Sequence, residues 1–398
     1  MARALLYLPE AASRALAARQ IAGRPLTVRA LVAAVRAGAT TIGIPVSLRD
    51  PAVERALERL PAATGAVRWL DPTIGRGPDA DSGEPWLLIP APLVIDPGCL
   101  RALLDPAAPA GGAVLANSMA GPAPVILAPA ALVARLWPKL AVGEPIGLDL
   151  ARHLDAARTE PRQAPGLLVV VRDEAGLVEA EQALYRRVGT GWDTGVDRFL
   201  HRRCSRWITR VLVRTPATPN LVSLASLAVG SAAIWCFWRA TPASAAWGIA
   251  FYALASILDH SDGELARLTY QESRFGAHLD WAIDTIIHAG VVLGMGLTAG
   301  GPVALAVGIA AAGGVTASAW FARILPHEIE VGEAVGGALE DMGNRDFFYL
   351  LLLAFVLFRW TATGLLLPLA LLVALGSQAY WVSCVSRIRR SRAAGARS

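Results

Sequence analysis

Four aspartates are spaced so that their carboxylates can meet at one point. Asp259 and Asp262 are three residues apart, and Asp280 and Asp284 are four residues apart. In an α-helix both spacings place the two side chains on one face. The intervening turn, residues 268–273, is short, so we expect two antiparallel helices whose carboxylates converge. Four carboxylates so close together need a cation between them, and oxygen-only ligands favour Mg²⁺ or Mn²⁺ over zinc.

Other residues near the aspartates are weaker ligand candidates. His260 and His278 interleave with the carboxylates but fall off their shared face. A purely structural alternative is a helix pair held by salt bridges to Arg267 and Arg274. Two arginines cannot neutralise four aspartates and two nearby glutamates, so we favour the metal site.

Small residues accompany the acidic face. Gly263 and Ala266 lie beside the aspartates, and Gly276 lies across the turn. Together they leave a gap without side chains, where a bulky ligand can approach the backbone. Small residues also serve plain helix packing in membranes. Next to a metal site, they favour a pocket for a nucleotide base or ribose.

The elements that must carry these residues are membrane helices. The chain of 398 residues is 54% hydrophobic, has a mean hydropathy of +0.45 and is only 17% charged. Soluble domains contain about 25% charged residues, so part of this chain must lie in lipid. The sequence is mixed up to residue 188 and almost continuously apolar from residue 219. Helices of about 20 residues cross a bilayer. We predict six such spans, at 220–238, 243–268, 275–299, 302–325, 346–358 with its flanks, and 361–385.

Arginines give the predicted orientation. They cluster before the first span, around the second and fourth connections, and after the last span. Positive residues mark the cytoplasmic side. We therefore expect a multi-pass protein of the cell inner membrane with both termini and the active site cytoplasmic. The net charge of +5 then reflects membrane anchoring, and nucleic-acid binding is not expected. Residues 196–215 mix apolar side chains with arginines and predict an amphipathic helix on the lipid headgroups.

The spacing of the site residues resembles a known family signature. The pattern is Asp259-x-x-Asp262-Gly263-x-x-Ala266-Arg267, then eight residues, then Gly276-x-x-x-Asp280-x-x-x-Asp284. It resembles the signature of the CDP-alcohol phosphotransferase (CDP-alcohol phosphatidyltransferase) family. The resemblance covers about residues 192–390.

The resemblance implies a phospholipid-biosynthesis transferase that uses two divalent ions, Mg²⁺ or Mn²⁺. It would move a phospho-alcohol group from a CDP-alcohol (CDP-diacylglycerol or a CDP-polyol) to an acceptor hydroxyl and release CMP. The acceptor would be a polyol or polyol phosphate, for example inositol phosphate; membrane lipids and a second copy of the chain, in a homodimer, would be partners. The implied metal ligands are Asp259, Asp262, Asp280 and Asp284, with Asp284 also the general base. The implied CDP site is Asp262, Gly263, Ala266, Arg267 and Gly276.

A phosphate on the acceptor would need cations at the cytoplasmic mouth of the site. The predicted topology places four arginines near the depth of the aspartates. Arginine suits this role because its planar fork pairs with phosphate oxygens. Anchoring to lipid headgroups is the alternative role, and it is the favoured one for Arg206 and Arg210. The four are Arg206, Arg210, Arg323 and Arg345.

The first half predicts an α/β domain. Strand-like runs at 4–8, 41–46, 67–70, 86–95, 114–116, 124–127 and 167–171 alternate with helical stretches. Residues 22–26 (AGRPL) with Arg29 are similar to the start of a nucleotidyltransferase of the sugar-phosphate cytidylyltransferase type. That family needs a glycine-rich loop for triphosphate, and residues 9–14 contain no glycine. Pro90-Ala91-Pro92 stands where a metal-binding aspartate is expected. We therefore expect a domain that has lost catalysis.

These observations together predict the organisation of the chain. We expect a nucleotidyltransferase-like α/β cytosolic domain at 1–190, an amphipathic juxtamembrane helix at 191–216, an all-α six-helix membrane domain at 217–390 and a basic tail at 391–398. The order, with Arg345 to Phe348 opening the fifth span, is similar to bifunctional inositol-phosphate cytidylyltransferase and di-inositol-phosphate-phosphate synthase proteins. An enzyme that also makes the CDP-alcohol from CTP is one alternative. A cation-binding transporter is another, disfavoured because all four aspartates cluster at one membrane face and no inverted repeat is evident.

Overall fold

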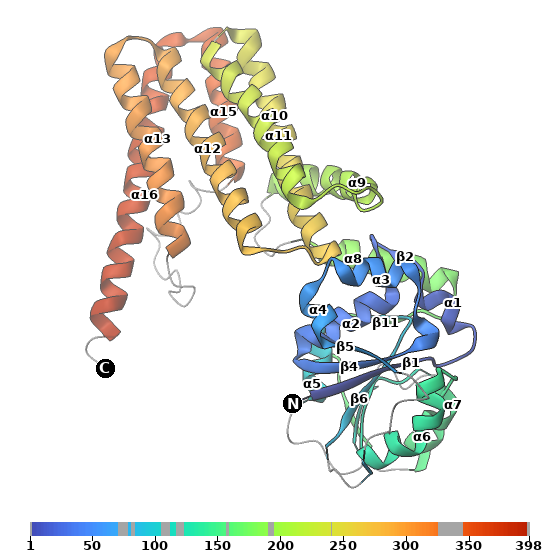
Figure 1. The fold of residues 1–398 in the computed structure, drawn as a ribbon. Helices are drawn as coiled ribbons and strands as arrows, with labels where there is room; N and C mark the ends of the chain where they lie inside the picture. The colour runs from blue at the N-terminus through green and yellow to red at the C-terminus, as the bar shows by residue number, and fades with distance from the viewer. Residues whose placement is uncertain are drawn as a thin grey trace. The chain divides into compact units, whose positions relative to one another are not determined.

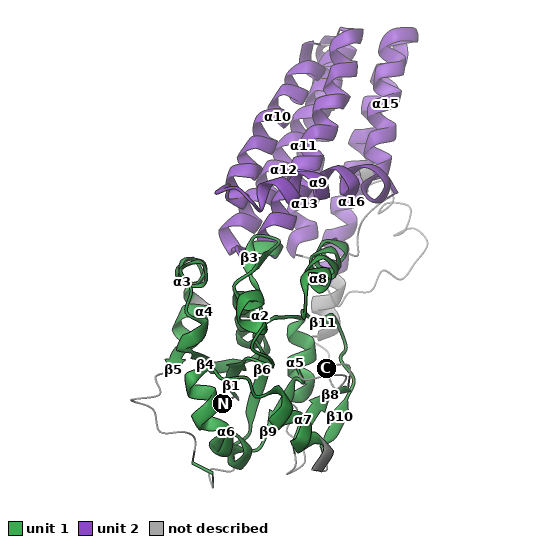
Figure 2. Cartoon of the chain, turned by 90° about the vertical axis from the view of Figure 1, so that its right-hand side faces the viewer, with its two compact units in different colours: residues 1–188, 268–270 green, residues 189–267, 271–398 purple. Residues whose placement is uncertain are grey.

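The chain forms two compact units. The structure, a computed structural model, describes residues 2–70, 79–80, 84–104, 112–116, 123–156, 159–189, 195–239, 241–324 and 345–395. Unit 1 comprises residues 1–188 with 268–270, and unit 2 comprises residues 189–267 with 271–398 (Figure 2).

Unit 1 is built on a seven-stranded mixed sheet in the order β10-β8-β9-β6-β1-β4-β5 (Figure 1). The four strands β6, β1, β4 and β5 are parallel, β9 is antiparallel to both β6 and β8, and β10 is parallel to β8. Two small pairs, β2–β3 and β7–β11, complete the unit. The strands are β1 Ala2–Tyr7, β2 Gln20–Ile21, β3 Arg24–Pro25, β4 Ala39–Pro45, β5 Val67–Leu70, β6 Trp86–Pro90, β7 Leu93–Ile95, β8 Ala113–Leu115, β9 Ile126–Ala128, β10 Glu160–Arg162 and β11 Leu168–Val170.

Helices bury both faces of this sheet. Along β1, Leu6 packs into a cluster with α2 (Leu26–Ala37) and α5 (Pro97–Leu103), whereas Leu5 and Tyr7 pack with α6 (Ala130–Val142). A strand buried on both faces reads as a continuous apolar run, and this explains why the start of the chain shows no alternation. The remaining elements of the unit are α1 Ser13–Ala17, η1 Val46–Leu48, α3 Pro51–Glu58, α4 Pro61–Ala66, α7 Gly147–Ala156 and α8 Glu174–Arg187.

The strand-like run predicted at 86–95 is two strands. β6 ends at Pro90 and β7 begins at Leu93. Pro90 and Pro92 have no N–H to donate, so a single hydrogen-bonded strand cannot run through them. β6 pairs with β1 inside the large sheet, and β7 leaves it to pair with β11.

Arg29 has a structural role in unit 1. The side chain is 2% exposed. Its Nη2 donates to the carbonyls of Ile21 and Ala22, each at 2.8 Å, and to Leu268 O at 3.0 Å. The carbonyls of Ile21 and Ala22 belong to the β2–β3 turn, where Ala22 has a φ of +43°. The arginine of the 22–29 pattern therefore stabilises a strained turn, since a buried guanidinium needs its donors paired.

Unit 2 is mostly helical. Its long helices α10, α11, α12, α13, α15 and α16 run alongside one another (Figure 1). α12 packs against α10, α13 and α16. Gly296 and Gly308 allow α12 and α13 to approach closely, because a Cβ built on Gly296 would lie 2.4 Å from Gly308 Cα. The elements are η3 Asp197–His201 (π-helical), α9 Arg202–Leu212, α10 Pro219–Arg239, α11 Pro242–Thr269, α12 Arg274–Ala299, α13 Gly301–Ile324, α15 Arg345–Thr361, η4 Thr363–Leu365 and α16 Leu366–Gly395.

Four helical segments are long and apolar enough to cross a membrane. They are α10, α12, α13 and residues Thr363–Arg389, which include most of α16. Their outward faces carry large apolar side chains, such as Leu221 and Ile309, each 58% exposed. A surface of this kind indicates contact with lipid. Two other predicted spans coincide with α11, which carries the acidic residues, and with α15, which is 17 residues long.

The α9 helix buries its polar side and exposes its apolar side. Arg202, Ser205 and Thr209 are buried, whereas Trp207 is 68% exposed. The buried side chains all bind Glu264 of α11: Arg202 Nη1 at 3.0 Å, Ser205 Oγ at 2.8 Å and Thr209 Oγ1 at 2.8 Å. This network fixes α9 against the half of α11 that contains the aspartates.

Candidate functional site

Helices α11 and α12 bring three of the four aspartates together. One carboxylate oxygen from each of Asp259, Asp262 and Asp280 lies within 4.8 Å of the other two. The turn between the helices is defined by Ser273, whose side chain accepts a hydrogen bond of 2.9 Å from Gly276 N and caps α12. The cap satisfies one of the free N–H groups at the start of the helix. It therefore fixes where α12 begins, at Arg274, less than two turns before Asp280.

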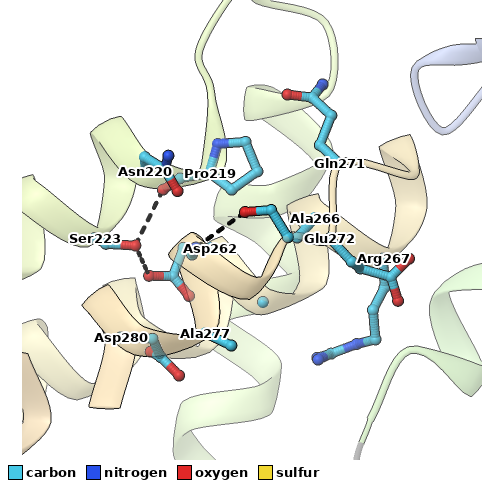
Figure 3. Close-up of a pocket in the computed structure, with 13 residues that line it drawn as sticks. Pro219, Asn220, Ser223, Asp262, Ala266, Arg267, Gln271, Glu272, Ala277 and Asp280 are labelled. Carbon is cyan, nitrogen blue, oxygen red and sulfur yellow. Dashed lines mark hydrogen bonds between the residues drawn. The ribbon is translucent and has the colours of Figure 1, made fainter. Parts of the chain in front are cut away.

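Asp262 is the buried member of the group. It is 5% exposed, while Asp280 is exposed and Asp259 is half-buried. Ser223 of α10 donates a 2.5 Å hydrogen bond to Asp262 Oδ2 (Figure 3). A third helix thus contributes to the site and orients one carboxylate. Carboxylates buried in this way are retained where a cation or several hydrogen bonds compensate for the lost hydration.

Asp284 lies one turn further along α12. Its side chain is 43% exposed, and His288 Nδ1 approaches its Oδ1 at 3.8 Å and its backbone oxygen at 2.7 Å. In the part of the chain that the structure describes, Asp284 is not within the 4.8 Å group. It follows Asp280 on the same helix face, as its spacing predicts.

A pocket of about 200 Å³ opens beside Asp262 and Asp280. Its lining includes the four predicted small or basic residues, Gly263, Ala266, Arg267 and Gly276. In Figure 3 the carboxylates of Asp262 and Asp280 lie on one side of this pocket and Arg267 lies on another. A ligand with a negatively charged group near the aspartates would require a cation there, and Arg267 can meet a second negative or polar group.

Both glycines of the pocket have little room for a side chain. A Cβ at Gly263 would lie 3.2 Å from Arg267 Nη1, and one at Gly276 would lie 3.1 Å from Ser273 Oγ and 3.3 Å from Asn220 Oδ1. The absence of these Cβ atoms keeps the lining shallow, so that a flat group can approach the helix backbone.

Sequence reasoning missed two residues of the site. Ser223 contacts Asp262, and Asn220 lines the pocket. Asn220 was identifiable only as the entry to the first span. The signal for Ser223 was a hydroxyl in the first turns of an apolar helix, which also fits ordinary helix packing in membranes.

The four arginines proposed for an acceptor phosphate have different environments. Arg323 stacks over Trp281, with 5.1 Å from its Cζ to the ring, and its Nη1 lies 3.5 Å from the carbonyl of Ala277, a pocket residue. Arg206 is half-buried, and its Nε is buried with no hydrogen-bond partner among the described residues. Arg210 is exposed. Arg345 opens α15, but its side chain lies outside the described residues.

The two histidines near the aspartates point elsewhere. His260 Nε2 lies 2.9 Å from Asp197 Oδ1, and His278 Nδ1 donates to the carbonyl of Arg274 at 2.5 Å. The described carboxylate group contains neither of them. Its ligands are therefore oxygens only, and such a set fits hard cations such as Mg²⁺ and Mn²⁺.

Comparison with known proteins agrees with this geometry. The family model described as CDP-alcohol phosphatidyltransferase matches residues 216–385. Residues 216–385 are therefore similar to the CDP-alcohol phosphatidyltransferase family. The family is one of transferases, and the matched range contains all eight positions of the motif together with Asn220 and Ser223.

Curated relatives match parts of the chain. A bifunctional IPC transferase and DIPP synthase of Rubrobacter xylanophilus is 35% identical over 137 residues, which are 34% of this chain and 30% of that protein. One with the same name from Thermococcus kodakarensis is 35% identical over 99 residues, 25% of this chain and 22% of that protein. A provisionally named cardiolipin synthase of Mycobacterium tuberculosis is 34% identical over 85 residues, 21% of this chain and 40% of that protein. The chain thus spans no more than 40% of the length of these relatives.

Proposed function

We propose that the chain is a metal-dependent CDP-alcohol phosphotransferase of a membrane. It moves the phospho-alcohol group of a CDP-alcohol to the hydroxyl of a second alcohol and releases CMP. The observation that carries the proposal is the meeting of Asp259, Asp262 and Asp280 at the edge of a pocket lined by Gly263 and Gly276. The match of residues 216–385 to a transferase family supports it.

The carboxylates are proposed to hold two divalent ions, Mg²⁺ or Mn²⁺. Asp259, Asp262, Asp280 and Asp284 supply the ligands, and the oxygen-only donor set supports a hard cation. When bound, such ions neutralise the diphosphate of the donor and stabilise the leaving CMP. Ser223 acts on Asp262 by holding one of its oxygens, which restricts the direction in which the other can point.

The cytidine and diphosphate are proposed to occupy the pocket. Gly263, Ala266 and Gly276 give the flat base or ribose access to the backbone. Arg267 at the pocket pairs with a phosphate oxygen, for which its fork geometry is suited. These contacts hold the donor phosphorus close to the carboxylates, so that little motion remains before reaction.

Asp284 is proposed as the general base. The acceptor oxygen attacks the phosphorus that bears the donor alcohol, the bond from this phosphorus to the CMP oxygen breaks, and the hydroxyl proton passes to Asp284. The exposure of its side chain and its place on the same face as Asp280 support this role. A general base needs to lie within hydrogen-bond reach of the acceptor hydroxyl.

The acceptor is proposed to be a polyol or polyol phosphate, for example inositol phosphate, and the donor CDP-diacylglycerol or a CDP-polyol. The names of two relatives, which are IPC transferases and DIPP synthases, support an inositol-type substrate. The position of Arg323 beside Ala277 supports a role for it in binding an acceptor phosphate.

We further propose a multi-pass arrangement in the cell inner membrane with six transmembrane helices and both termini cytoplasmic. In this arrangement α11 and α15 also span the bilayer, and α9 lies in the headgroup region with Trp207 towards the lipid. The exposed apolar side of α9 supports this interfacial position. The proposed domain boundaries are those predicted from the sequence, 1–190, 191–216, 217–390 and 391–398. The first domain is proposed to be nucleotidyltransferase-like and inactive. Two copies of the chain are proposed to form a homodimer.

The test is release of CMP by the purified full-length protein. CDP-alcohols of both kinds are supplied with polyol and polyol-phosphate acceptors, with Mg²⁺, Mn²⁺ or a chelator. We expect a metal-dependent reaction that Asp262→Asn abolishes while the protein stays folded, because the variant removes a ligand charge and no packing. Asp149→Asn, which changes a half-buried aspartate paired with Lys139 in unit 1, is the control. If the Asp262→Asn protein keeps more than a few per cent of the activity, the carboxylate site is not the catalytic centre.

A further inference from the structure

A second group of metal-binding side chains lies in unit 2. Asp197 and His201 belong to the π-helical segment η3, and His260 belongs to α11. One ligand atom from each lies within 4.8 Å of the other two. None of the three belongs to the CDP-alcohol signature, and the chemistry proposed above does not use them.

The two imidazoles converge on a single carboxylate oxygen. His201 Nδ1 lies 2.8 Å and His260 Nε2 lies 2.9 Å from Asp197 Oδ1. The side chains of His201, Asp197 and His260 are 0%, 7% and 11% exposed. Two nitrogens and one oxygen therefore lie together in a space largely closed to solvent.

The surroundings of His201 are typical of a metal ligand. Its second ring nitrogen, Nε2, lies 2.9 Å from the hydroxyl of Tyr349 on α15. Histidines that bind metals almost always use their other nitrogen for such an outer hydrogen bond, which fixes the orientation of the ring. The segment that carries Asp197 and His201 is π-helical, and short π-helical turns are frequent at functional sites.

We propose that Asp197, His201 and His260 bind one divalent cation of the zinc class. Imidazole nitrogens favour zinc and its neighbours, whereas the oxygen-only carboxylates of the other site favour Mg²⁺ or Mn²⁺, so the two sites select different ions. Three protein ligands leave the fourth tetrahedral position for water. The ion cross-links η3 to α11 at the residue that follows Asp259, and through Tyr349 it connects both to α15.

The distances are compatible with this ion. Zinc lies about 2.0–2.2 Å from nitrogen and oxygen ligands, which places tetrahedral ligand atoms about 3.3 Å from each other. The facing atoms here are 2.8 and 2.9 Å apart, so each side chain moves outward by a few tenths of an ångström when the ion enters. The competing arrangement is a plain hydrogen-bond network without a metal ion. In it, His201 Nδ1 and His260 Nε2 each carry a proton and donate it to Asp197 Oδ1.

The experiment measures zinc bound to the full-length protein in detergent. The protein is stripped with a chelator and equilibrated with limiting Zn²⁺ in the presence of excess Mg²⁺, and bound zinc is counted by mass spectrometry. We expect about one Zn²⁺ per chain. We expect Tyr349→Phe to weaken the affinity about 10- to 100-fold, the usual effect of an outer-shell change. His260→Gln should lose the bound zinc, and Co²⁺ in place of zinc should give the visible absorption of a four-coordinate ion.

Two controls separate this site from other causes. Asp262→Asn should keep its zinc, which excludes the carboxylate site as the place of binding. His153→Gln, a change in unit 1, should also keep it. If the unaltered protein binds no zinc under these conditions, or if His260→Gln binds as much as the unaltered protein, the cluster is a hydrogen-bond network and the proposal is wrong. Thermal unfolding without metal shows whether each variant is folded. If His260→Gln does not fold, Tyr349→Phe still tests the proposal, because it removes only the hydroxyl beside His201 Nε2. Because bound zinc is the readout, failure here leaves the proposed transferase activity unaffected.

Discussion

Asp262 is the residue on which the candidate active site depends. It is nearly fully buried and shares its surroundings with Asp259 and Asp280. Acidic side chains inside apolar helices are costly, and they persist where they have a function. The hydroxyl of Ser223 compensates only one of its two carboxylate oxygens among the bonds described above.

The contact between Ser223 and Asp262 gives a specific expectation. Ser223→Ala removes the hydrogen bond that orients the carboxylate but leaves every proposed ligand in place. We expect the concentration of Mg²⁺ or Mn²⁺ that gives half-maximal CMP release to rise about 10-fold, within the range observed for partners of metal ligands. A titration of activity against metal concentration measures this shift.

Ser226 provides the matched control. It lies on the same helix, is equally buried, and donates to the carbonyl of Ala255 at 3.1 Å instead of to an aspartate. Ser226→Ala should leave the metal requirement unchanged. If the two alanine variants shift the metal titration equally, the effect comes from helix packing and Ser223 does not position Asp262.

Arg323 is the acceptor arginine with the best-defined position. It stacks on Trp281 and reaches towards Ala277 at the pocket. A charge-assisted hydrogen bond contributes about 1.5–3 kcal/mol, so we expect Arg323→Ala to raise the KM for a phosphorylated acceptor about 10-fold or more. The KM for the CDP-alcohol should change much less. Steady-state kinetics with each substrate varied in turn measures both.

The control for Arg323 is another arginine stacked on tryptophan. Arg239 lies 5.4 Å from the ring of Trp235 and ends α10, the helix that begins at the pocket residues Pro219 and Asn220. Arg239→Ala should change neither KM. Equal effects of Arg323→Ala on both substrates, or no effect, would mean that Arg323 only anchors its helix.

At the scale of elements, the sequence predicted much of what the structure contains. The apolar runs located the long helices, and the spacing of the aspartates placed them correctly on α11 and α12. The sequence alone could not reveal that Glu264 is bound by Arg202, Ser205 and Thr209. The periodicity of α9 shows which side is apolar, but a polar side that faces a buried partner looks the same as one that faces water. Contacts between residues about 60 positions apart depend on packing that no local pattern encodes.

The crossing of α12 and α13 depends on two glycines. A Cβ on Gly296 would meet backbone atoms of Gly308 and Ala304 at less than 3.0 Å. Because backbone atoms cannot move aside as a side chain can, we expect Gly296→Ala to destabilise the protein by about 1–3 kcal/mol, the usual cost of overpacking. A lower temperature of unfolding in detergent, and faster loss of CMP-releasing activity on heating, would show it.

Gly313 separates this effect from a change in helix propensity. It lies on α13, where a Cβ would meet nothing within 4 Å. Gly313→Ala should leave the unfolding temperature unchanged or raise it slightly, since alanine favours a helix by up to about 1 kcal/mol over glycine. If both alanine variants are equally stable, α12 and α13 do not depend on close contact at Gly296.

At the scale of the whole chain, the two halves differ in how far the sequence explains them. The motif in the second half specifies a site at eight positions, and six of them, all except Asp259 and Asp284, line the same pocket. In the first half the pattern AGRPL with Arg29 suggested nucleotide chemistry. In the structure Arg29 binds the carbonyls of Ile21 and Ala22. A short pattern does not determine whether an arginine meets a ligand or the backbone of its own turn.

Unit 1 is expected to lack nucleotidyltransferase activity. Binding a nucleoside triphosphate requires backbone N–H groups free to face the phosphates, which a glycine-rich loop supplies. Here residues 9–14 contain no glycine, and the chain turns directly into α1 at Ser13. The full-length Asp262→Asn protein is the right material, because it blocks the proposed transferase and leaves unit 1 intact. Supplied with CTP, Mg²⁺ and a range of polyol phosphates, it should release no pyrophosphate above background. Release that depends on a polyol phosphate would show that unit 1 makes the CDP-alcohol, and the enzyme would then be bifunctional.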